Sequence, residues 1–194
     1  VGGMTYPQLA TSGALLAGQG GVMRLDGSDT PIKRVPFIVI GNNSLGQSGA
    51  SRAAQFMLLE QAFREARAPA PGDERLLTSA GRRVLAQQLL SERFLVYVNR
   101  ESDIRQVVKL ARNNGVRVAL FGAAEAWRLA DVLAAERIPV FIDALDNLPA
   151  SFDQIGASEN NAALLQRAGV SVSFFNGNDA SHNARKVRQI AGNA

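Results

Sequence analysis

The sequence predicts an α/β fold in which parallel strands are joined by crossover helices. From residue 93 onward, four short apolar runs are each followed by a segment with helical periodicity. Consecutive βα units of this kind indicate a parallel sheet with right-handed connections. Half of a (β/α)8 barrel and a doubly wound open sheet both fit this pattern.

The four βα units are delimited by their apolar strands and by helix-ending glycines. Residues 94–98 form the first predicted strand, and we expect Ser102 or Asp103 to cap the helix after it and Gly115 to end that helix in a left-handed conformation. The other strands are predicted at 116–121, 139–142 and 170–175. The other helices are predicted at 124–136, at 160–168 with Gly169 as its cap, and from 183 to the end. A long loop, 143–159, precedes the helix at 160–168.

Residues 1–92 are less regular and predict short β segments followed by two helices. The run 32–40 contains Pro36, which indicates an edge strand or a bulge. The polar stretch 41–50 is glycine-rich but lacks the Gly-Lys-Ser/Thr ending of a phosphate-binding loop, so we interpret it as a connection ahead of a helix. That helix is predicted at 51–67, and Asp73 is expected to cap the next one.

We expect residues 1–194 to form a single incomplete domain, with irregular β segments and two helices in 1–92 and the four βα units in 93–194. A complete (β/α)8 barrel takes about 250 residues. The chain begins without Met and ends inside a helical pattern, which predicts that it is part of a longer protein. Half of a barrel therefore fits, and an open sheet is the alternative.

The composition excludes several classes of protein. The 194 residues are 46% hydrophobic and 20% charged, as in a soluble globular domain. The composition does not distinguish a cytoplasmic from a periplasmic protein. The net charge of +4 comes from scattered arginines, which argues against a nucleic-acid partner. There is no cysteine, and no apolar run approaches the roughly 20 residues of a membrane span.

Polar side chains follow each of the four predicted strands, at the edge where both architectures place their sites. They are Tyr97, Asn99, Arg100 and Glu101; Gly122 and Glu125; Asp143, Asp146 and Asn147; and Asn176, Asn178, Asp179, Ser181 and His182. The carboxylates among them could hold a metal or carry a proton.

Four segments in order resemble the imidazolonepropionase-like subgroup of the amidohydrolase superfamily. They are RESDIR at 100–105, GAAEAW at 122–127, DALDNLP at 143–149 with SFD at 151–153, and DASHNAR at 179–185 with QIAGNA at 189–194; LAGQGGVMRLDG at 16–27 resembles an earlier stretch of the same proteins. The resemblance implies the later half of a TIM-type (β/α)8 barrel of the metal-dependent hydrolase kind.

The same resemblance implies a hydrolase that cleaves C–N bonds of small amide, cyclic amide or peptidic substrates. A divalent metal, zinc in most of these proteins, activates the attacking water. Asp179 matches the proton-carrying acid on the last strand and is the metal ligand that the resemblance implies, although this chain holds no complete metal site. The residues expected to contact substrate are Tyr97, Asn99, Arg100, Asp146, Asn147 and His182.

The departures from the family support a second hypothesis, a degenerate barrel that serves as a non-catalytic binding or partner subunit. The early His-x-His pair is not in this chain, Tyr97 and Asn99 stand where related members often carry histidines, and the next strand ends in Gly122. We expect the 194 residues alone to be inactive, because the first-strand ligands lie outside them, and to self-associate through unpaired barrel edges.

Several candidate residues also have a structural interpretation. Asp179 precedes a helix and could cap it, and Asp146 could anchor the long loop. Arg100 could clamp a substrate carboxylate or pair with a loop. A lone histidine such as His182 cannot build a metal site, so a hydrogen bond at the helix start or a substrate contact is expected for it.

Overall fold

The structure is a computed structural model that describes residues 2–5, 15–24, 30–68, 75–91, 93–143, 148–175 and 187–193. Its strands are β1 (Gly2–Thr5), β2 (Leu16–Arg24), β3 (Lys33–Val39), β4 (Arg93–Val98), β5 (Arg117–Gly122), β6 (Val140–Asp143) and β7 (Val172–Phe175). Its α-helices are α1 (Arg52–Arg67), α2 (Ser79–Ser91), α3 (Glu101–Asn114), α4 (Ala130–Ala135), α5 (Asn161–Arg167) and α6 (Val187–Asn193), and its 3-10 helices are η1 (Asn42–Ser48), η2 (Ala126–Leu129) and η3 (Phe152–Gln154).

The chain divides into two compact units. One contains Val1–Val96 and Leu110–Arg117, and the other contains Tyr97–Lys109 and Val118–Ala194. The division passes through β4, α3 and β5, so these three elements contribute residues to both units.

The first unit carries the antiparallel strands. β1 pairs with β2 and β2 with β3, both antiparallel, and β4 follows β3 in the strand order. β3 is therefore not an edge strand, although it contains Pro36. The register of β2 shifts between Leu16 and Gln19, opposite Pro36, so the bulge is the correct interpretation of the proline.

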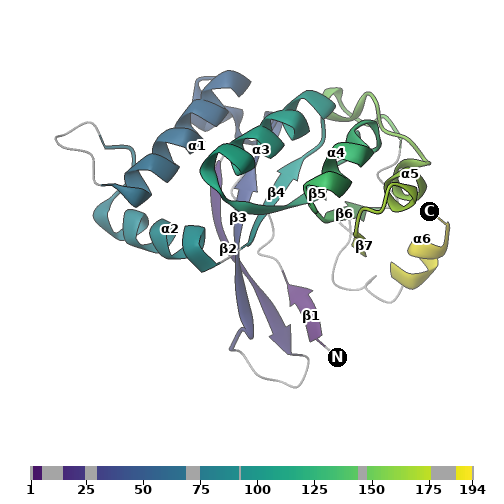
Figure 1. Cartoon of the computed structure of the whole chain (residues 1–194), viewed down its shortest axis with the longest axis horizontal. Coiled ribbons are helices and arrows are strands. Elements are labelled where there is room, and N and C mark those ends of the chain that lie inside the picture. The colour runs from purple at the N-terminus through teal and green to yellow at the C-terminus, as the bar shows by residue number, and fades with distance from the viewer. Residues whose placement is uncertain are drawn as a thin grey trace. The chain divides into compact units, whose positions relative to one another are not determined.

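Helices α1 and α2 of the first unit pack side by side (Figure 1). The predicted start of α1 is confirmed, because the Ser51 hydroxyl accepts a hydrogen bond from the backbone N–H of Ala54. On its buried face, the Phe63 ring lies 5.8 Å from that of Phe94 on β4.

The predicted start of α2 is wrong. The helix begins at Ser79, and the Thr78 hydroxyl accepts from the N–H of Gly81. The residues before it are held from α1, where the carboxylate of Glu65 accepts from the N–H groups of Leu76 and Leu77 at 2.9 and 3.0 Å. These backbone bonds, led by the one from Leu76, lower the pKa of Glu65 against the opposing effect of its burial.

The second unit carries the parallel strands. β5 pairs in parallel with β6 and β6 with β7, and the strand order β4-β5-β6-β7 follows the chain. Each parallel pair is joined by a crossover that contains a helix (Figure 1). The predicted parallel strands with crossover helices are thus confirmed.

The ends of these helices agree with the sequence predictions in part. Gly115 and Gly169 follow α3 and α5 with φ of +59° and +86°, as expected of glycines that end helices. The predicted cap of α3 is wrong, because Ser102 and Asp103 lie inside a helix that starts at Glu101. The segment predicted as one helix at 124–136 divides into η2 and α4.

Within the described ranges, the helices are too short or too polar for any of them to cross a membrane.

Candidate functional site at the carboxyl ends of the parallel strands

The carboxyl ends of β4 to β7 share one face that combines aromatic rings with buried polar groups. Opposite residues of parallel strands lie on the same face, and the register pairs Asp143 with Phe175. The rings of Phe121 and Phe175 stack at 3.9 Å, and the ring of Tyr97 lies 6.0 Å from that of Phe121. Asp143, which is 4% exposed, therefore lies on the face of these rings.

Tyr97 and Asn99, two predicted substrate contacts, lie on this face. Tyr97 belongs to β4 and Asn99 directly follows its last residue, so the two are two positions apart and point to the same side. The side-chain N–H of Asn99 donates to the Tyr97 hydroxyl at 3.0 Å. Its amide oxygen accepts from the backbone N–H of Ala124 at 3.3 Å. Asn99 is 5% exposed, so its carboxamide is buried with both ends hydrogen-bonded inside the protein.

Gly122, at the end of β5, has no room for a side chain. Its φ is +84°, in the region that favours glycine. A Cβ atom there would lie 2.8 Å from the amide oxygen of Asn99 and 3.1 Å from Cε2 of Tyr97. The last residue of β5 therefore offers only its backbone, and Phe121 before it contributes the ring.

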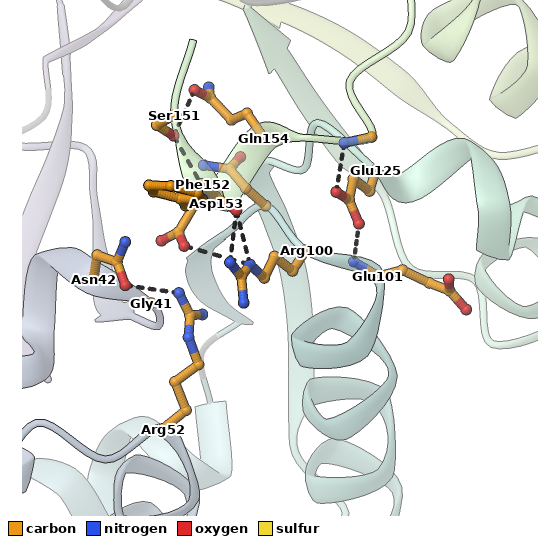
Figure 2. A network of polar contacts seen from close by, with 12 residues as sticks. Gly41, Asn42, Arg52, Arg100, Glu101, Glu125, Ser151, Phe152, Asp153 and Gln154 are labelled. Atoms are coloured by element: carbon orange, nitrogen blue, oxygen red, sulfur yellow. Dashed lines mark hydrogen bonds and ion pairs between the residues drawn. The ribbon is translucent and has the colours of Figure 1, made fainter. Parts of the chain in front are cut away.

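Arg100, the third predicted substrate contact within the described ranges, is directed to the loop after β6. Figure 2 shows its guanidinium donating to the carbonyl oxygen of Phe152, at 3.0 Å from Nε and 2.7 Å from Nη2. Its Nε also lies 3.5 Å from a carboxylate oxygen of Asp153. Of the two roles that the sequence left open for Arg100, pairing with the loop is the one present in this geometry.

The same loop is fastened at Gly156, which is bonded on both sides. Its N–H donates to the carboxylate of Glu125 at 2.8 Å, and its carbonyl accepts from the indole N–H of Trp127 at 2.9 Å. The second oxygen of Glu125 accepts from the N–H of Glu101 at 2.8 Å, so this carboxylate also caps α3 (Figure 2). A Cβ at Gly156 would lie 2.9 Å from the Glu125 carboxylate, which explains the glycine.

Asn161, the first residue of α5, completes this fastening. Its amide oxygen accepts from the N–H of Trp127 at 3.0 Å, and its side-chain N–H donates to the carbonyl of Ala123 at 3.0 Å.

Glu125 is among the polar residues that the sequence places at this edge. Its partners are 24 and 31 residues away, and no local pattern indicates them.

The other predicted site residues, Asp146, Asn147, Asp179 and His182, lie outside the described ranges. Among the residues that are described, no three His, Cys, Asp or Glu side chains gather closely enough to hold a metal ion. Zinc in proteins is held by imidazole, thiolate or carboxylate ligands. The phenol of Tyr97, the carboxamide of Asn99 and the bare backbone of Gly122 do not fit such a site.

Comparison with known proteins supports the fold. No family model matches the chain, and no curated protein matches it. Among solved structures, it is similar to the crystal structure of an amidohydrolase from Thermotoga maritima MSB8, with a TM-score of 0.76 and 18% sequence identity. The match covers 92% of this chain and 51% of that chain, so this chain spans about half the length of the neighbour.

At this level of identity the likeness concerns the fold alone. The predicted fold class, a partial (β/α)8-type barrel with parallel strands and crossover helices, is confirmed. The same fold can carry unrelated chemistries, so an activity has to be argued from the site.

Proposed function

We propose that the full-length protein is a hydrolase that cleaves C–N bonds of small amide, cyclic amide or peptidic substrates. The proposal is supported by the likeness of 92% of the chain to an amidohydrolase barrel. It is also supported by the buried carboxylate of Asp143 at the carboxyl end of β6, the edge at which such barrels bind their substrates.

In this proposal, the described strands provide the wall of the site and not its metal. Asp179 is proposed as the acid that moves a proton during the reaction, and Asp146, Asn147 and His182 as substrate contacts. These four assignments rest on the sequence resemblance. A divalent metal would supply an activated water when bound, but the residues at the ends of β4 and β5 do not fit it, and no step is assigned through them.

The full-length protein should hydrolyse at least one compound in a panel of N-acyl amino acids, dipeptides and cyclic amides. Replacement Asp179→Asn should lower kcat by about 10²-fold or more, because a general acid–base group contributes that much. The matched control is Asp131→Asn, which removes an exposed carboxylate from α4 and should leave kcat unchanged. No turnover across the panel would contradict the proposal.

A second candidate, a non-catalytic binding or partner subunit, is favoured by one specific observation. The positions at which related proteins often carry histidines are occupied by a hydrogen-bonded Tyr97–Asn99 pair, and Gly122 has no room for a ligand side chain. Calorimetric titration with the same panel separates the two candidates. Saturable binding without turnover would favour the second, and turnover sensitive to Asp179→Asn would exclude it.

A further inference from the structure

The turn after β5 is held in place by the end of β4. Three consecutive N–H groups donate to two residues: Ala123 to the carbonyl of Val98 at 2.8 Å, and Glu125 to the carbonyl of Asn99 at 3.0 Å. Between them, Ala124 donates to the side-chain oxygen of Asn99. All of the N–H groups of residues 123–125 are therefore engaged by Val98 and Asn99.

This turn has an unusual backbone that needs such support. Gly122 has φ of +84°, and the buried Ala123, a residue with a Cβ, has φ of +51°. Left-handed conformations are costly for residues other than glycine and persist where the surroundings hold them. Here the oxygen of the Asn99 carboxamide holds the turn by accepting the N–H of Ala124. The N–H₂ group of the same carboxamide donates to the Tyr97 hydroxyl, which fixes its orientation.

We propose that the ends of β4 and β5 form a structural lock that takes no divalent metal. This β4–β5 lock consists of Tyr97, Asn99 and Gly122 with the turn of residues 122–125. To ligate a metal, Asn99 would have to release the N–H of Ala124, which is itself buried, and an unpaired buried N–H is costly. A metal in the full-length protein would thus be held by other strands. The lock rests on this geometry and not on the proposed hydrolase activity.

A pair of glycine substitutions in the full-length protein tests the lock by equilibrium unfolding in urea. Gly122 and Gly169 have nearly equal φ, +84° and +86°, but a Cβ at Gly169 would meet no atom within 4 Å. Gly169→Ala therefore measures backbone strain alone. Gly122→Ala should raise the unfolding equilibrium constant about tenfold more than Gly169→Ala, because it also overpacks against Asn99.

The double variant Gly122→Ala/Asn99→Ala extends the test. Removing the Asn99 side chain frees the space for the new Cβ, so the combined effect should be smaller than the product of the two single effects. Equal costs at Gly122 and Gly169, or independent effects in the double variant, would overturn the lock.

Metal content provides a second readout that does not depend on activity or on these glycine variants. After equilibrium dialysis against zinc, the full-length protein and its Tyr97→Phe and Asn99→Asp variants should hold the same amount of zinc per chain. If Tyr97 or Asn99 were a zinc ligand, the variants would differ from the unaltered protein in zinc content. A loss of zinc in Tyr97→Phe, or a gain in Asn99→Asp through its new carboxylate, would overturn the proposal.

Discussion

Gln55 and Asn99 are both buried carboxamides, and each holds a backbone segment that contains a glycine with positive φ. The side chain of Gln55, which is 0% exposed, accepts from the N–H of Gly41 at 3.0 Å. It donates to the carbonyl of Gly41 at 2.9 Å and to the hydroxyl of Ser44 at 3.0 Å. Asn99 likewise accepts one backbone N–H and donates to one hydroxyl.

The two carboxamides differ in where they stand and what they hold. Gln55 lies on α1 and closes the segment that directly precedes its own helix, whereas Asn99 follows β4 and holds the turn after the next strand. Both segments contain polar residues and glycines, a composition that binding loops share, although the sequence predicts 41–50 as a connection. In both, groups that could have contacted a ligand bond to the chain itself. A polar, glycine-containing stretch is therefore weak evidence of a binding loop until its buried partners are known.

The largest effect is expected when the carboxamide of Gln55 is removed. Gln55→Met keeps the length of the side chain but leaves the N–H of Gly41 and the Ser44 hydroxyl without this partner. We expect a loss of about 3 kcal/mol in the free energy of unfolding, measured in urea. The control Arg52→Met removes a hydrogen bond to Asn42 at the surface and should cost at most about 0.5 kcal/mol. If Gln55→Met and Arg52→Met lowered the free energy of unfolding equally, burial of the Gln55 carboxamide would not explain its contribution to stability.

The carboxylate of Glu125 resembles the two carboxamides in that it accepts hydrogen bonds from backbone N–H groups. Glu125→Gln leaves one oxygen for two N–H donors, those of Glu101 and Gly156, and points an N–H₂ group at one of them. We expect a loss of about 2 kcal/mol and faster proteolysis within residues 148–160. Glu159→Gln, at an exposed position of the same loop, should change neither. Unchanged proteolysis in Glu125→Gln would mean that the carboxylate does not hold the loop.

A third test separates carboxylate from carboxamide by pH. The pKa of Glu65 is lowered in the folded protein, chiefly by the hydrogen bond from Leu76, so its unfolded-state pKa is the higher of the two. Its stabilising contribution is complete above the unfolded-state pKa and is lost as the pH falls through the folded-state value.

Unfolding in urea between pH 7 and pH 3 should therefore show a smaller loss of stability in Glu65→Gln than in the unaltered protein. The Gln55 network contains no titrating group, so Gln55→Met should keep the pH dependence of the unaltered protein. Parallel curves for Glu65→Gln and the unaltered protein would contradict the role assigned to Glu65.

The smallest effect is expected at Arg100, whose side chain is 33% exposed. Arg100→Lys keeps the charge but loses the paired hydrogen bonds to the Phe152 carbonyl. We expect a loss of at most about 1 kcal/mol, as for other exposed ion pairs. Titration of the full-length protein with anionic and neutral amides should show equal affinities before and after the change. A selective loss of anionic ligands would instead support the substrate clamp.

Much of the secondary structure could be predicted because its causes are local. The apolar periodicity of 51–67 predicts α1, and Gly115 and Gly169 end their helices as expected. The predictions failed where a distant residue supplies the cap. Glu125 caps α3 from 24 residues away, so Ser102 and Asp103 are helical, and Thr78 takes the position expected for Asp73.

By itself, the sequence determined the alternation of strands and helices and the polar character of the strand ends. Periodicity and the glycines that end helices depend on neighbours a few residues apart, so they can be inferred from order alone. Only the tertiary structure decided which polar groups bond to one another. Asn99 meets Ala124 across 25 residues and Glu125 meets Gly156 across 31, and such pairs form only when the sheet brings the strand ends together.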